Sequence, residues 1–179
     1  MILRPSRSVL ALPLILALIA AGAGCRRITG NAATPLQIME DFTLRQSERG
    51  VLIWDLQART AVLHEETGDA DLSEPRMQFY RGGQVASKLS ALNGRVLMDT
   101  HDVLLSSSVV VDAVEERAVL HTSTLAYSSK SNLFTTDAEV RIHRPEGDLQ
   151  GQGMVAKPDL SELHIFHQRS LVKEKADGL

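Results

Sequence analysis

Histidine, carboxylate, serine and cysteine side chains are the groups with which a protein most often builds bases, nucleophiles and metal sites. His164 and His167 form the one close histidine pair in the sequence. Residues three apart on a strand face opposite sides, so these two would need a bulge to share a metal ion. We interpret both as solvent-facing residues near a C-terminal strand and expect no metal site.

Two further clusters have residue types suited to catalysis. The sequence DTHD at 99–102 places carboxylates on both sides of His101, but such a cluster between strands is typical of a turn. Ser170 and Lys173 have the spacing of a serine–lysine pair, yet they lie in a polar tail without a companion motif. We therefore predict that the protein is not an enzyme, has no catalytic residues and uses no cofactor.

The only cysteine, Cys25, ends a different pattern. Arginines precede an apolar run from about Val9 to Ala23, and the run finishes in small residues. This is the layout of a bacterial secretory signal with a small-residue cleavage site. A cysteine directly after such a site resembles the lipobox of bacterial lipoproteins, which predicts lipid attachment at Cys25.

The same segment also fits an uncleaved helical anchor, because its length is near the lower end of the ~17–25 residues that span a bilayer. Both readings place Arg26 onward outside the cytoplasm, since Arg4 and Arg7 stay inside. A lone thiol in an exported chain cannot form an internal disulfide.

The expected organisation follows from these segments. It comprises a signal peptide or membrane anchor (1–25), a polar spacer (26–37), one periplasmic domain (38–168) and a charged tail (169–179). The net charge of −3 and the lack of a long basic run give no indication of a nucleic-acid partner. With 4% aromatic residues, aliphatic side chains must supply most of the core.

A two-residue apolar period dominates the domain. In VLIWDLQART, Leu52, Trp54, Leu56 and Ala58 share one parity, which places them on one face of a strand. The same period recurs in later runs, whose apolar positions include Met77, Phe79, Val85, Leu89, Ala91, Val109, Val111, Ala113, Leu125, Tyr127, Val140 and Ile142.

Turn signals separate these runs, among them ERG at 48–50, ETGDAD at 66–71 and RGG at 81–83. Asn93-Gly94 predicts a tight hairpin, because both residues tolerate positive φ. Short alternating strands about ten residues apart indicate an antiparallel all-β domain.

The order of several motifs is informative as well. The chain opens with F-x-L…G…W-x-L-x-A-x-x-A from Phe42 to Ala61 and closes with T-T-D-A-x-V-x-I…G-x-L-x-G-x-G from Thr135 to Gly153. Between them stand P-R-M-x-F-Y at 75–80, L-S-A-x-x-G at 89–94 and L-x-T-x-x-L-x-Y at 120–127. Over roughly Ile38 to Leu163, the sequence resembles the LptC family, the periplasmic component of the lipopolysaccharide export machine.

This resemblance implies an incomplete, twisted antiparallel β-jellyroll, shaped as a folded trough whose apolar interior takes the acyl chains of lipopolysaccharide. It further implies that the protein accepts the lipid from the inner-membrane ABC transporter, a complex of permease and ATPase, and passes it to a periplasmic LptA-type bridge protein. On this reading the lipid-lining residues are Trp54, Leu56, Phe79, Leu89, Val109, Val111, Tyr127, Val140 and Ile142.

Unpaired strand edges are templates for a partner's strand, so the ends of the sheet are the expected docking sites. We expect Phe42 and Leu44 to mark the edge that faces the transporter, and Leu163 and Ile165 the edge that faces the bridge protein. The rival interpretation is a structural or adaptor lipoprotein of the cell envelope that never holds lipid. Arg26 after the cysteine matches outer-membrane sorting, whereas the family role requires the inner membrane.

Overall fold

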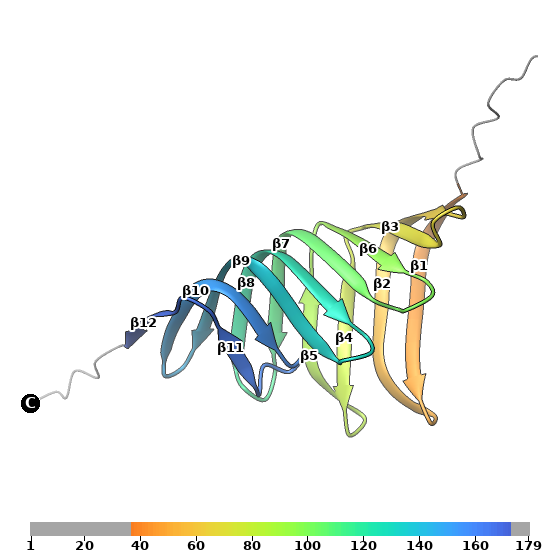
Figure 1. Ribbon diagram of the computed structural model, residues 1–179. Coiled ribbons are helices and arrows are strands. Elements are labelled where there is room, and N and C mark those ends of the chain that lie inside the picture. The colour runs from red at the N-terminus through yellow and green to blue at the C-terminus, as the bar shows by residue number, and fades with distance from the viewer. Residues whose placement is uncertain (1–36, 173–179) are drawn as a thin grey trace, which may run out of the picture. The chain divides into compact units, whose positions relative to one another are not determined.

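The computed structural model describes residues 37–172, all of whose regular elements are strands (Figure 1). The predicted signal or anchor segment with Cys25, the spacer up to residue 36 and the tail from residue 173 lie outside the described residues. The strands are β1 (Gln37–Glu48), β2 (Val51–His64), β3 (Asp69–Ser73), β4 (Arg76–Arg81), β5 (Gln84–Ser90), β6 (Asn93–Leu97), β7 (Val103–Ala113), β8 (Ala118–Ser128), β9 (Leu133–Arg144), β10 (Gly147–Ala156), β11 (Leu163–Ile165) and β12 (Arg169–Val172).

All these strands belong to one antiparallel sheet, which confirms the all-β prediction. From β7 to β11 the strands follow one another in chain order, whereas β2 and β7 each have two partners along one side. β2 pairs with β4 through residues 54–57 and with β3 through 60–64. In the same way, β7 pairs with β6 through 103–106 and with β5 through 110–113.

This split pairing divides the sheet into two facing layers, because the long strands bend over between their two sets of partners (Figure 1). The β3–β6 layer holds β3, β6, β11 and one half of each long strand. The β4–β5 layer holds β4, β5, β12 and the other halves. We call the line where the strands bend the crease. The result is the jellyroll-like fold predicted from the sequence.

Backbone conformation marks the crease strand by strand. Asp41 in β1, Ser107 and Ser108 in β7, Gly153 in β10 and His167 between β11 and β12 all have positive φ. The register shifts at the same places, between Ser106 and Val109 and between Gln152 and Met154, for example. Bulges of this kind bend a strand sharply.

Threonine side chains satisfy backbone groups that the bent strands leave unpaired. The Thr122 hydroxyl donates to the Glu139 carbonyl oxygen at 2.9 Å, and the Ala138 amide donates to the Thr136 hydroxyl at 3.1 Å. Thr124 and Thr136 share a hydrogen bond of 3.3 Å. These bonds lie within the bend, where two of them join β8 to β9.

The Asn93-Gly94 hairpin prediction is wrong. Both residues lie inside β6, which pairs with β3 and β7, while β5 pairs with β4 and β7. Gly94 has no positive φ; a Cβ there would meet the Pro75 ring at 3.1 Å and the Leu104 carbonyl oxygen at 3.3 Å. The glycine therefore allows Pro75 and the neighbouring β7 strand to approach β6 closely.

Turn composition correctly predicts the connection between β4 and β5, but it does not predict the two short strands β3 and β12. Gly82 and Gly83 have positive φ and connect β4 to β5, as RGG predicts. β3 begins at Asp69, inside the segment ETGDAD that we expected to be a turn. β12 lies in the expected tail, where residues 169–172 pair with β10. Backbone pairing to a preformed edge needs no apolar alternation in the added strand.

Candidate functional site

The space between the two layers is the strongest candidate for a functional site. All nine residues predicted to line it are buried, each at most 3% exposed, and all belong to one apolar cluster. Their neighbours of opposite parity, such as Gln78, Val110 and Arg141, are half-buried or exposed. The two-residue period thus separates inner from outer positions.

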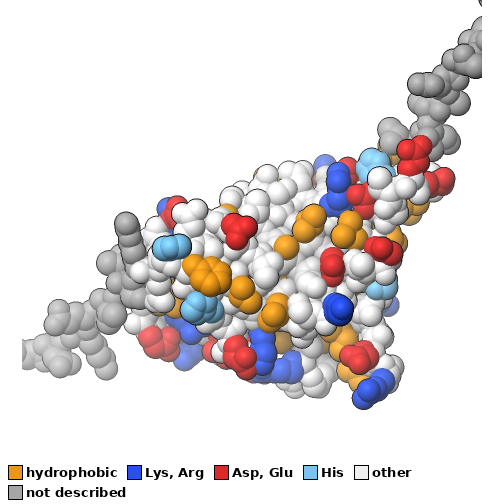
Figure 2. Space-filling model, in the orientation of Figure 1, with side chains coloured by type: hydrophobic (Ala, Val, Ile, Leu, Met, Phe, Trp, Pro, Cys, Tyr) orange, Lys and Arg blue, Asp and Glu red, His pale blue; other side chains and the backbone are white. Residues whose placement is uncertain are grey.

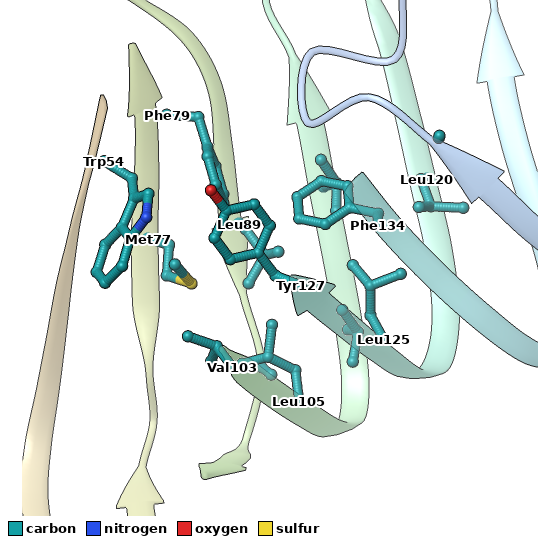
Figure 3. Packing of buried hydrophobic residues seen from close by; sticks show 14 of the residues in the cluster. Trp54, Met77, Phe79, Leu89, Val103, Leu105, Leu120, Leu125, Tyr127 and Phe134 are labelled. Carbon is teal, nitrogen blue, oxygen red and sulfur yellow. The ribbon is translucent and has the colours of Figure 1, made fainter. Parts of the chain in front are cut away.

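Aromatic rings fill the middle of this interior (Figure 3). The ring of Phe79 from β4 lies edge to face against Tyr127 and Phe134, with centroids 4.9 and 5.2 Å apart. Trp54 from β2 completes the group at 6.2 Å from Tyr127. The contacts join the two layers, so in this state side chains of the protein itself occupy the interior.

Tyr127 and Ser87 are two uncharged polar residues inside the layers. Burial raises the pKa of Tyr127 to about 12, an effect that the nearby Trp54 indole opposes, so the phenol stays protonated at physiological pH. Its hydroxyl donates to Asn132 at 3.2 Å. Ser87 is 0% exposed, and its hydroxyl has no hydrogen-bond partner among the described residues. Burial of an unpaired ion among these mostly apolar side chains would be unfavourable.

A buried carboxylate lies on the outer face of the β4–β5 layer. Asp55 is only 8% exposed, although its parity is that of the solvent-facing residues. The Tyr80 hydroxyl donates to it at 2.6 Å, and this bond raises the pKa of Tyr80. The sequence pattern could not reveal this pair, because it depends on pairing between β2 and β4.

The two ends of the sheet carry the predicted docking residues. In β1, which pairs with β2 alone among the described strands, Phe42 and Leu44 are half-buried. At the other end, β11 and β12 share the free side of β10; Leu163 is half-buried and Ile165 is 6% exposed. Both ends therefore present backbone edges, and Ile165 contributes to the core as well.

Glycines explain how the last edge closes on β10. A Cβ at Gly151 would collide with the side chain of Ile165 and would lie 2.8 Å from the Phe166 carbonyl oxygen. At Gly153, which has positive φ, it would lie 2.9 Å from the Phe166 ring. The closing G-x-G of the sequence therefore makes room for the segment between β11 and β12.

The histidine pair His164/His167 and the DTHD cluster at 99–102 lie in different parts of the sheet. His164 contacts the ring of Phe166, with centroids 4.9 Å apart, and DTHD forms the turn between β6 and β7. In residues 37–172, no group of three or more metal-ligating side chains could hold a metal ion. The side chain of Ser170 is not described, and Lys173 lies outside the described residues.

The face in Figure 2 mixes charged and apolar side chains, and Phe166, at 41% exposed, is one of the larger exposed apolar residues. Nothing within residues 37–172 forms a helix that is long and apolar enough to cross a membrane. The face drawn in Figure 2 therefore differs from the interior, where the buried apolar cluster lies.

A family model supplies an independent comparison. No curated protein matches the chain. The model of the family described as lipopolysaccharide-assembly, LptC-related, matches residues 9–170, which is most of the sequence and includes every described strand except the end of β12. The chain therefore belongs to the LptC family and is involved in lipopolysaccharide transport.

Proposed function

We propose that this protein is a membrane-anchored periplasmic conduit that carries lipopolysaccharide with its acyl chains between the two layers of the sheet. The observation that supports this most directly is the continuous apolar cluster, which extends from Trp54 in β2 to Ile165 in β11. Such a cluster offers an acyl chain apolar surroundings along the sheet.

The hydrophobic effect is sufficient to drive binding. Each buried methylene contributes about 0.8 kcal/mol, so an acyl chain of about ten methylenes gains a large free energy without any specific polar contact. Few polar contacts are also an advantage for a conduit, because a lipid held by non-directional forces can move along the interior.

Lipid must displace the side chains that fill the interior. The layers are joined at the crease by strands that continue through it, so they can separate through φ and ψ changes at residues such as Ser107 and Gly153. Separation of this kind leaves the ladders within each layer intact. The aromatic contacts of Phe79 with Tyr127 and Phe134 join the two layers and are lost on opening.

The sheet edges serve as docking sites in this proposal. The β1 edge, with Phe42 and Leu44, faces the inner-membrane ABC transporter, and the edge of β11 and β12, with Leu163 and Ile165, faces the LptA-type bridge protein. Photo-crosslinkers at the exposed Glu40 and His164 should capture transporter and bridge protein respectively. A crosslinker at Lys88, on the outer face of a central strand, should capture neither.

The protein is held at the periplasmic side of the inner membrane by its N-terminal segment. Lipid attachment at Cys25 is the favoured means and a retained helix is the alternative. The protein acts as a transport component and not as an enzyme.

One observation favours a second candidate. Because side chains of the protein itself fill the interior, the domain could act as an adaptor that supports an envelope assembly without holding lipid. The two candidates differ in whether an acyl chain ever reaches the inner positions.

Trp54 provides the test, since it is the only tryptophan and is buried in the interior. The full chain, held in an amphipathic polymer without free detergent, is titrated with dibromostearate, whose bromines quench tryptophan on contact. We expect saturable quenching, and unbrominated stearate should compete with it. Unquenched Trp54 emission at every concentration would support the adaptor instead.

A further inference from the structure

Residues 157–162, between β10 and β11, form a compact loop that we call the closure segment. The Lys157 amide donates to the Glu162 carbonyl oxygen at 2.9 Å, and the Leu160 amide donates to the Lys157 carbonyl oxygen at 2.9 Å. The Ser161 amide donates to the Asp159 carboxylate at 3.0 Å. These bonds lie within the segment, so it can move as one unit.

The closure segment connects β10 to β11 at the end of the β3–β6 layer that is away from the crease. Two arginines of the opposite layer contact it. Arg81, at the end of β4, contacts the Asp159 carboxylate at 2.6 Å and also pairs with Glu115. Arg144, at the end of β9, donates to the Leu160 carbonyl oxygen at 3.0 Å. These contacts join the two layers on the side away from the crease.

Leu160 gives the segment an apolar anchor. Its side chain is 0% exposed and belongs to the same cluster as the interior residues. Its φ is +55°, a left-handed conformation that is unfavourable for a branched side chain such as leucine. A residue in this conformation persists only where its surroundings hold it, and strain of this kind is often found in segments that move.

A small cavity of about 110 Å³ lies under the closure segment. Phe79 of the aromatic group lines it, together with Ala86 from the β4–β5 layer and Asn132 and Pro158 from the β3–β6 layer. Sites that enclose small ligands usually measure about 300–1,000 Å³. The cavity therefore reaches the interior but cannot hold an acyl chain while the segment is closed.

We propose that the closure segment is the gate through which acyl chains pass into the interior from the side opposite the crease. The proposal rests on the proposed function, since it assumes that lipid occupies the interior. At the crease, continuous strands block access. On the open side, the closure segment is held to the opposite layer by the Arg81–Asp159 pair and by the hydrogen bond from Arg144 to Leu160, and release of these contacts opens a path past it.

The rate at which dibromostearate quenches Trp54 in stopped flow tests the gate. Asp159→Asn removes the cross-layer ion pair without changing a buried apolar group, and we expect it to raise the rate about 2–5-fold, the range for a partly exposed pair. Leu160→Ala removes the anchor and should raise the rate more than about tenfold. Both variants should reach an equilibrium quenching similar to that of the wild type.

Matched controls separate gating from general loosening. Glu139→Gln breaks an exposed ion pair with Arg141 in a single strand, and Leu104→Ala shortens a leucine of β7 that is 47% exposed and lies outside the interior. Neither should change the rate beyond twofold. Wild-type rates in both closure-segment variants, with quenching retained, would overturn the gate and leave the proposed function standing. Unquenched emission in every protein would overturn both.

Discussion

Replacing Gly151 by alanine tests how the last edge of the sheet closes. Gly151 has no positive φ, so alanine brings no backbone strain, and the whole effect comes from the added Cβ. That atom would collide with the Ile165 side chain and lie 2.8 Å from the Phe166 carbonyl oxygen, 3.2 Å from the Gln168 Cα. Two of these three obstacles are backbone atoms, which cannot rotate away.

Two effects determine how much stability Gly151→Ala loses. Forcing one extra carbon into close packing typically costs about 1–3 kcal/mol. Release of the edge instead exposes Ile165, now 6% exposed, at about 1.5–3 kcal/mol. We therefore expect Gly151→Ala to lower the free energy of unfolding by about 2 kcal/mol, or the melting temperature by about 4–8 °C.

Urea unfolding followed by Trp54 emission measures this loss, and hydrogen exchange of residues 163–172 reports whether the edge is released. Gln152→Ala, at the exposed neighbouring position, is the control and should change stability by less than about 0.5 kcal/mol. If the edge is released, the crosslinker at His164 should also lose its capture of the bridge protein. A stability of Gly151→Ala within about 0.5 kcal/mol of the wild type would refute the reasoning.

Phe134→Ala should lower the free energy of unfolding by about 3–5 kcal/mol in urea titrations, because it removes a buried ring that contacts Phe79 and Tyr127; a loss below about 1 kcal/mol would contradict the contacts. The hydrogen bond from Arg95 lowers the pKa of Asp71, so its stabilisation is complete above the ordinary value of 3.8 and disappears as pH falls through the lowered pKa. Asp71→Asn should therefore cost less than about 1 kcal/mol at pH 7 and progressively less below pH 3.8, and a pH-independent cost would argue against the pair. Labelling with a fatty-acid probe should require Cys25, and equal labelling of Cys25→Ala would show that the segment is a plain helix.

Alternation along the strands could be predicted from sequence because one face of each strand is buried and the other is solvated. Trp54, Phe79 and Val140 illustrate this, since each has the apolar phase of its own strand and each lies in the interior. The sequence pattern also predicts the edge position of β11. The local apolar period thus identifies long strands such as β2, β7 and β9 and their inner faces, but not the short strands β3 and β12.

Features that depend on pairing between distant strands could not be predicted in this way. Asn93-Gly94 has the composition of a hairpin, but β6 pairs with β3 and β7. Asp55 has solvent-facing parity and is nevertheless buried by Tyr80. The closure segment is polar in composition, and only the fold brings Asp159 to Arg81. The crease follows from positive φ at serine and aspartate, which sequence composition does not specify.

In-cell photo-crosslinking along the two faces tests the central claim most directly. Crosslinkers at the inner positions Phe79, Val109 and Val140 are compared with their outer neighbours Gln78, Val110 and Arg141, each in the full chain with the transporter present. We predict that the inner positions capture lipopolysaccharide in an ATP-dependent way and that the outer ones capture much less. Equal lipopolysaccharide capture at inner and outer positions, or no capture at inner positions in a folded protein, would contradict the account.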